Sequence, residues 1–174
     1  MDRKCIPCDS LIPPFVYHCS SCQRCVVMMD HHCPWINNCV GLYTQKLFFL
    51  FNTYAVITFS FSLILIVKQF NRDIFCSITE SCKIKDWTAY ILASISLITA
   101  ALIFTLIVLV DQMVIIANRY SVIERVRLYS NRLGKKVKKR GYENYQFTFG
   151  GPFSLGWFFP FPPKRTHTVE SLYK

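Results

Sequence analysis

The sequence predicts an α-helical membrane protein, in which a two-helix transmembrane hairpin follows a small, irregular cysteine-rich domain. Three observations support this fold class: two long uncharged stretches, a cluster of cysteines and histidines near the start, and a hydrophobic content of 52% in 174 residues. That content, together with 16% aromatic residues, exceeds what a small soluble domain usually carries.

Residues 1–46 are polar and rich in turn-forming residues, and they lack the periodicity of a helix or a strand. Seven of the nine cysteines and three of the four histidines fall in the first 39 residues. Histidines among cysteines on a basic segment favour metal ligands in a reducing compartment over a secreted disulfide framework. We therefore expect bound metal to replace a hydrophobic core in this segment.

The cysteines and histidines repeat with an offset of fourteen residues, and each set has the form C-x2-C-x9-H-x6-C. The two sets are Cys5, Cys8, His18 and Cys25, then Cys19, Cys22, His32 and Cys39. Three thiolates and one imidazole fill a tetrahedral Zn²⁺ site, and closed sites of this kind are structural. We expect two zinc ions, and so a zinc-bound domain. One zinc site, with the other thiols free or on another soft metal, stays open as an alternative.

His31 and Cys33 remain after both sets are filled, within the run Asp30-His31-His32-Cys33. This run supplies a thiol nucleophile, an imidazole that can take its proton, and a carboxylate that can orient the imidazole. Thiolate is the reactive form of cysteine, and a neighbouring imidazolium favours it. The alternative is that His31 supports a zinc ligand by a hydrogen bond and that Cys33 is a spare buried thiol.

Two uncharged stretches, residues 47–67 and 87–110, are each long enough to cross a bilayer core of about 30 Å. A pair of buried helices in a large soluble core is the disfavoured alternative. The two ends of the chain hold 16 Lys and Arg and the 68–86 loop holds four, which predicts that both termini are cytosolic. Cys76 and Cys82 would then face the lumen or exterior, as a disulfide or as two free thiols.

Residues 111–174 continue the second helix briefly and then become basic and aromatic. The basic run from Lys135 to Arg140 suits an anionic leaflet or a phosphate-bearing ligand, with a solvated linker as the alternative. No nucleic-acid partner is expected, because no recognition motif accompanies the charge. The aromatic tail, residues 142–163, should pack on the hairpin or lie at the membrane interface. The expected domains are 1–46, 47–67, 68–86, 87–110 and 111–174.

The Asp-His-His-Cys run and the following residues 34–41, PWINNCVG, closely resemble the DHHC-type protein S-acyltransferases, or palmitoyltransferases. The resemblance implies that Cys33 takes a long-chain acyl group from acyl-CoA, such as palmitoyl-CoA, and passes it to a cysteine of a membrane-proximal protein. It implies that His31 is the general base and Asp30 orients it, while His32 binds zinc. A nucleophile this close to a membrane helix suits a substrate with an apolar tail.

The resemblance further implies an acyl-chain cavity on one helix face, although ordinary helix packing stays open for that face. The face is Phe48, Phe51, Ala55 and Thr58. Ser121 and Glu124 approximate a family Thr-Thr-x-Glu motif, and Asn144 begins a C-terminal motif that packs against the helices. By the same resemblance, the membrane is that of the endoplasmic reticulum or Golgi.

Several departures from the family pattern matter. Members usually have four membrane helices, so we expect a partial chain that lacks the first two. Ile12 and Phe15 replace basic residues, and Thr44 replaces Asn. The loss of two positive charges would weaken binding of CoA phosphates unless the Lys135–Arg140 run compensates for it. The preferred function is ping-pong S-acyl transfer through Cys33, and the alternative is a catalytically inactive, truncated zinc-binding membrane adaptor. A zinc hydrolase is disfavoured because closed zinc sites leave no position for water.

Overall fold

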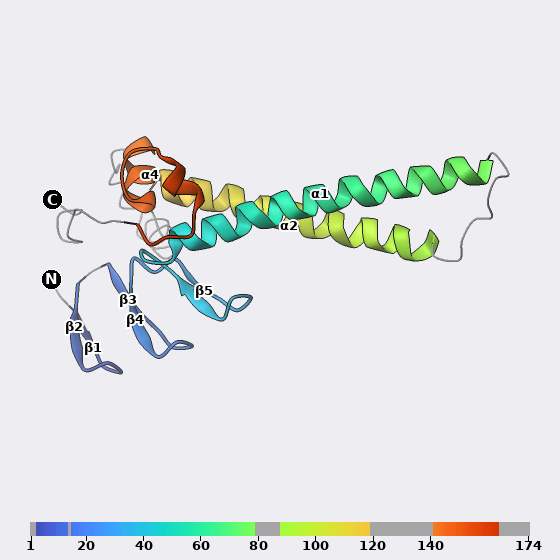
Figure 1. Cartoon of the computed structure of the whole chain (residues 1–174). Helices are drawn as coiled ribbons and strands as arrows, with labels where there is room; N and C mark the ends of the chain where they lie inside the picture. Colours follow the sequence, from blue (N-terminus) through green and yellow to red (C-terminus); the bar gives the residue numbers. More distant parts are fainter. Residues whose placement is uncertain (1–2, 14, 79–87, 119–140, 164–174) are drawn as a thin grey trace, which may run out of the picture. The chain divides into compact units, whose positions relative to one another are not determined.

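The computed structural model describes residues 3–13, 15–78, 88–118 and 141–163 (Figure 1). These residues fall into two compact units, residues 1–50 with 112–174 and residues 51–111. The first unit contains the cysteine-rich segment and the C-terminal segments, and the second contains most of the two long helices.

The cysteine-rich segment forms three short antiparallel β-hairpins (Figure 1). In chain order they are β1 (Arg3–Cys5) with β2 (Ser10–Ile12), β3 (Val16–Cys19) with β4 (Arg24–Val27), and β5 (His31–Cys33) with β6 (Asn38–Val40). Strands of three or four residues are too short to show a period of two, so the sequence predicts irregular structure here. The small domain is present, but it is more regular than expected.

The hairpins repeat with the same fourteen-residue offset as the cysteines and histidines. At the turn of each hairpin one residue adopts a left-handed backbone: Asp9 (φ 45°), Gln23 (φ 52°) and Asn37 (φ 46°). Each of these residues follows the last position of a C-x2-C spacing or its equivalent. One hairpin is therefore the repeating unit, and its tight turn brings the two ends of each C-x2-C spacing together.

The hydrophobic core of these hairpins is small. One cluster contains Cys5, Ile12, Phe15 and Val16, and a second contains Cys19, Met29 and Cys39. Ile12 and Phe15 are each only 9% exposed, so these two apolar residues serve the core. Clusters of this size cannot stabilise a domain alone, which agrees with the prediction that metal does so.

Backbone hydrogen bonds join the hairpins and lead the chain into the first helix. The N–H of Met28 donates to the carbonyl of Phe15 at 2.8 Å, which extends the second hairpin beyond its last strand pair. The N–H of Leu42 donates to the carbonyl of Val27 at 3.0 Å, which links the end of the third hairpin to the second. The Thr44 hydroxyl then donates to the Cys39 carbonyl at 2.8 Å and accepts the Gly41 N–H at 3.0 Å. Thr44 thus ties a predicted zinc ligand to the beginning of the helix.

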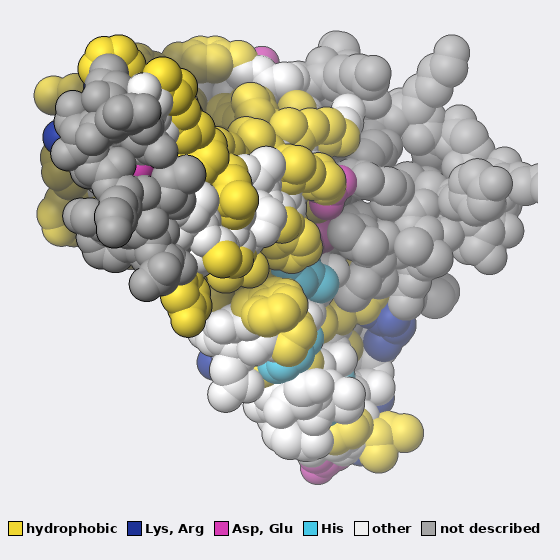
Figure 2. Space-filling view, turned by 90° about the vertical axis from the view of Figure 1, so that its right-hand side faces the viewer, with side chains coloured by type: hydrophobic (Ala, Val, Ile, Leu, Met, Phe, Trp, Pro, Cys, Tyr) yellow, Lys and Arg dark blue, Asp and Glu magenta, His cyan; other side chains and the backbone are white. Residues whose placement is uncertain are grey.

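Two long apolar helices follow, α1 (Gln45–Ile78) and α2 (Thr88–Asn118). Both are long and apolar enough to cross a membrane, with mean hydropathy of 2.0 and 2.6. Large apolar side chains cover much of the described surface in Figure 2, and Phe61 and Leu97 are 61% and 72% exposed. The predicted fold class is confirmed. α1 continues past residue 67, and the predicted domain limits stay predictions.

The described C-terminal segments are a helix, α4 (Gly141–Phe149), and a 3₁₀ turn, η1 (Leu155–Phe158). The rings of Phe149 and Trp157 stack with centroids 4.7 Å apart, and Phe49 at the start of α1 packs edge-on to Phe149 at 5.4 Å. The aromatic tail therefore packs against the beginning of α1.

Candidate active site and metal centres

Each predicted ligand set comes together in the structure. The ligand atoms of Cys5, Cys8, His18 and Cys25 all lie within 4.8 Å of one another, and so do those of Cys19, Cys22, His32 and Cys39. In the first set Cys8 Sγ is 3.3 Å from His18 Nδ1, and in the second Cys39 Sγ is 3.3 Å from Cys22 Sγ. Ligand atoms about 2.0–2.3 Å from one tetrahedral centre lie roughly 3.5 Å apart. The two clusters suit two zinc ions.

The ionisation of the clustered thiols also favours a bound cation. Burial and then the neighbouring thiols of Cys22 and Cys19 raise the pKa of Cys39 to about 12, and the pKa of Cys25 is raised to about 12 by burial and its own neighbours. The Cys22 N–H instead donates to Cys19 Sγ at 3.4 Å and lowers the pKa of that thiol. Because the thiolates repel one another, each set needs a cation to ionise fully, which fits Zn²⁺.

The two faces of strand β5 carry different residues: His32, a predicted metal ligand, on one face, and the predicted catalytic residues His31 and Cys33 on the other. Successive side chains of a strand point to opposite faces, so His31 and Cys33 share one face and His32 lies on the other. His32 directs its Nδ1 to the second cysteine cluster, 3.3 Å from Cys22 Sγ. One strand of three residues therefore supplies a metal ligand on one side and the predicted base and nucleophile on the other.

Cys33 takes the place in the third hairpin that Cys5 and Cys19 take in the first two. Continuing the repeat by fourteen residues gives Cys33, Ile36, Lys46 and Thr53 as a third set. Ile and Lys cannot complete a structural zinc site of this type. The Cys33 thiol, which is free and 4% exposed, therefore has no metal set to join.

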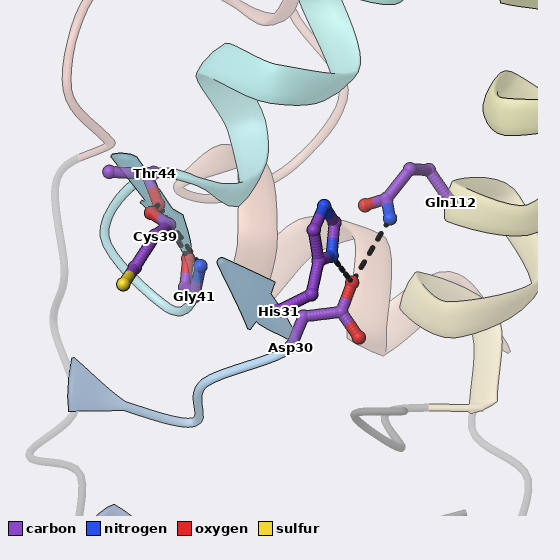
Figure 3. A network of polar contacts seen from close by, with 6 residues as sticks. All are labelled: Asp30, His31, Cys39, Gly41, Thr44 and Gln112. Atoms are coloured by element: carbon purple, nitrogen blue, oxygen red, sulfur yellow. Dashed lines mark hydrogen bonds and ion pairs between the residues drawn. The ribbon is translucent and has the colours of Figure 1, made fainter. Parts of the chain in front are cut away.

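A buried carboxylate contacts the His31 ring (Figure 3). Asp30 is 2% exposed, and its Oδ2 lies 3.1 Å from His31 Nδ1. Since a carboxylate accepts hydrogen bonds, this contact assigns the ring hydrogen to Nδ1 and leaves the Nε2 lone pair for another group. The same Oδ2 also accepts a hydrogen bond from Gln112 Nε2 of α2 at 3.1 Å.

The predicted acyl-chain face begins beside this histidine. Phe48 is 6% exposed and packs edge-on to the His31 ring, with centroids 5.5 Å apart. Further along α1, Phe51 is 55% exposed, Ala55 is half-buried and Thr58 is exposed. Contact with an acyl chain stays a prediction for all four residues.

Asn144 connects the C-terminal helix to the end of α2. Its Nδ2 donates to the carbonyl of Ala117 at 2.7 Å, and the Tyr145 hydroxyl donates to that of Met113 at 2.9 Å. These two contacts join α4 to the end of α2, and the role of Asn144 as part of a family motif stays a prediction. Ser121, Glu124 and the Lys135–Arg140 run lie outside the described residues.

Comparison with known proteins agrees with this geometry. The model of the family described as DHHC palmitoyltransferase matches residues 1–128. The chain belongs to this family. It is 38% identical over 160 residues to the palmitoyltransferase ZDHHC3 of Rattus norvegicus and 34% identical over 169 residues to ZDHHC7 of Mus musculus. Over 65 residues it is 48% identical to a probable protein S-acyltransferase 15 of Arabidopsis thaliana.

The alignments cover most of this DHHC chain but about half of its longer relatives. They include 91% of the chain and 52% of rat ZDHHC3, and 96% of the chain and 54% of mouse ZDHHC7. The Arabidopsis alignment covers 37% of the chain and 26% of that protein.

Sequence reasoning missed two buried polar residues, one that contacts the Asp30 carboxylate and one that contacts the C-terminal segment. The sequence marks Gln112 only as part of the end of the second helix, and Lys46 only as the boundary of the first apolar stretch. Lys46 is 3% exposed, and its Nζ donates to the carbonyls of Gly156 at 2.9 Å and Phe161 at 3.0 Å. A polar residue at the edge of an apolar stretch is visible in the sequence for both Gln112 and Lys46. The hydrogen-bond partner of each lies far away in sequence, so its identity could not be predicted.

Proposed function

We propose that this chain carries the catalytic centre of a protein S-acyltransferase. Cys33 would take a long-chain acyl group from acyl-CoA, such as palmitoyl-CoA, and pass it to a cysteine of a membrane-proximal protein. The observation that carries the proposal is a free, buried Cys33 on the same strand face as a histidine whose Nδ1 contacts a buried aspartate. Family membership and the adjoining apolar helix support the same chemistry.

The first half-reaction acylates the enzyme. The Cys33 thiol gives its proton to Nε2 of His31, and the sulfur attacks the thioester carbonyl of acyl-CoA. The bond between the carbonyl carbon and the CoA sulfur breaks, and the leaving thiolate takes the proton back from His31. Asp30 keeps the other ring nitrogen protonated and stabilises the imidazolium while it exists.

The second half-reaction reverses these roles. The substrate cysteine gives its proton to His31 and attacks the carbonyl of acyl-Cys33, and Cys33 leaves as a thiolate that recovers the proton. One thioester replaces another in each step, so no extra driving force is needed. Zinc bound by the two sets would hold the hairpins in place, and four protein ligands at each ion leave no position for substrate.

We also propose the membrane setting. Both termini would be cytosolic, because most Lys and Arg lie outside the 68–86 loop. Cys76 at the far end of α1 is disulfide-bonded, which supports an oxidising compartment on that side, and Cys82 lies outside the described residues. A membrane of the endoplasmic reticulum or Golgi has the cytosol on one side and an oxidising lumen on the other, so it suits both the cytosolic termini and the disulfide. The domain limits given above remain part of this proposal.

Labelling with an alkynyl long-chain fatty acid tests the proposal. Cells expressing the chain should show a label that hydroxylamine removes and that Cys33→Ser abolishes, because a thioester at Cys33 carries it. Zinc content serves as the control, since Cys33 belongs to neither ligand set. A zinc-replete wild-type chain without label would favour the inactive adaptor instead.

A further inference from the structure

Gln112 occupies an unusual position near the end of α2. It is 2% exposed, and its Nε2 donates to Oδ2 of Asp30, a residue 82 positions earlier in the chain. The other half of the amide has no such contact: Oε1 is buried and lacks a hydrogen-bond partner among the described residues. Figure 3 shows the amide directed at the Asp30–His31 pair.

Fold stability does not explain this side chain. A buried amide oxygen without a partner is unfavourable, because water would satisfy it in the unfolded chain. Methionine has nearly the same length and volume, carries no polar group to desolvate, and suits a helix equally well. The amide is therefore better explained by the hydrogen bond that it donates than by packing.

That hydrogen bond acts on the orientation of the carboxylate. The terminal torsion of an aspartate is broad, so the carboxylate plane of Asp30 can rotate about its last bond. Two donors from separate elements converge on one oxygen, His31 Nδ1 of β5 and Gln112 Nε2 of α2, each at 3.1 Å. Two fixed donors select one rotation of the carboxylate, and so one orientation of the imidazole.

We propose that Gln112 is a positioning residue for acyl transfer at Cys33. It holds Asp30 in the rotation in which Oδ2 receives Nδ1–H of His31, which leaves the Nε2 lone pair to take the proton of the Cys33 thiol. The inference rests on the proposed function and extends it to α2. Misplacement of a catalytic group by about 1 Å can reduce rates a hundredfold, so loss of this hydrogen bond should slow the acylation of Cys33 about tenfold to a hundredfold.

The experiment compares Gln112→Met with Gln69→Met in the full chain reconstituted in lipid. Gln69 is a matched control, because it also lies in a long helix and donates to an aspartate, Asp73 Oδ1, at 2.8 Å. The rate of single-turnover acylation of Cys33 is measured at increasing palmitoyl-CoA. This gives the limiting rate and the palmitoyl-CoA concentration at which half of that rate is reached. We expect Gln112→Met to lower the limiting rate, with unchanged half-saturation, zinc content and melting temperature, and Gln69→Met to match wild type.

A double-mutant cycle asks whether Gln112 acts through Asp30. Once Asp30→Ala has removed the carboxylate, Gln112→Met should cause no further loss of rate. If the double variant instead loses acylation rate by the product of the two single losses, the inference is overturned. A wild-type rate in Gln112→Met, or loss of zinc from that variant, would also overturn it. If wild type and Gln69→Met fail to acylate, the proposed function itself is wrong, which separates the two failures.

Discussion

Gly41 follows the third hairpin and lies against strand β4 of the second, and replacing it with alanine should destabilise the zinc domain. A Cβ atom at Gly41 would lie 2.9 Å from Val26 Cγ1 and 3.0 Å from the Val27 carbonyl oxygen. The valine methyl can rotate away, but the carbonyl is fixed in β4 and accepts the Leu42 N–H at 3.0 Å. Relief of the contact must therefore lengthen that hydrogen bond.

The expected loss follows from these two effects. Overpacking of one methyl group costs roughly 1–3 kcal/mol, and a weakened buried hydrogen bond adds about 0.5–1 kcal/mol. Gly41→Ala should thus lose about 2 kcal/mol, and at about 4–8 °C per kcal/mol for a small domain this lowers the temperature of zinc release by roughly 8–16 °C.

Zinc release on heating, followed with a chromogenic chelator, measures this loss. Gly141→Ala is the control, because a Cβ at Gly141 would meet nothing within 4 Å. Equal release temperatures for the two variants would refute the argument from close approach.

Three further predictions concern residues around the two clusters. Cys22→Ser should release zinc and unfold the hairpins, whereas Cys33→Ser should keep zinc, and stoichiometric zinc loss from Cys33→Ser would mean that the ligand sets are misassigned. Thr44→Val should lose roughly 1–2 kcal/mol of stability, because the Gly41 N–H loses its acceptor, and Thr44→Ser should restore it; equal melting of all three chains would contradict this. Lys46→Met should speed hydrogen exchange in residues 155–161 without zinc loss, and unchanged exchange there would argue against the Lys46 contacts.

The sequence predicted those features that arise from nearby residues. The ligand sets are repeated at a fixed offset, so their spacing alone predicted two clusters, and the length of two uncharged stretches predicted α1 and α2. The three hairpins escaped prediction because their strands are short and have almost no apolar alternation. Metal-ligand turns determine these strands, and hydrophobic patterning does not.

The predicted triad residues also lie in one short run, which is why they could be named from sequence. Gln112 could not be named, because nothing local marks a residue that contacts Asp30 across 82 positions. The burial of Lys46 could not be predicted from the sequence either, since a lysine before an apolar stretch ordinarily faces the membrane interface. In both cases, tertiary packing gave an ordinary polar residue its partner.

Transfer of an acyl group from Cys33 to an acceptor tests the central claim most directly. The reconstituted chain is loaded with palmitoyl-CoA, freed of excess donor, and mixed with a cysteine-bearing peptide anchored to the same vesicles. Mass spectrometry then follows the acyl group on the Cys33 peptide and on the acceptor. The account predicts that acyl-Cys33 decays as the acylated acceptor appears in equal amount. An acylated acceptor formed equally well by Cys33→Ser, or an acyl-Cys33 that never decays with acceptor present, would contradict it.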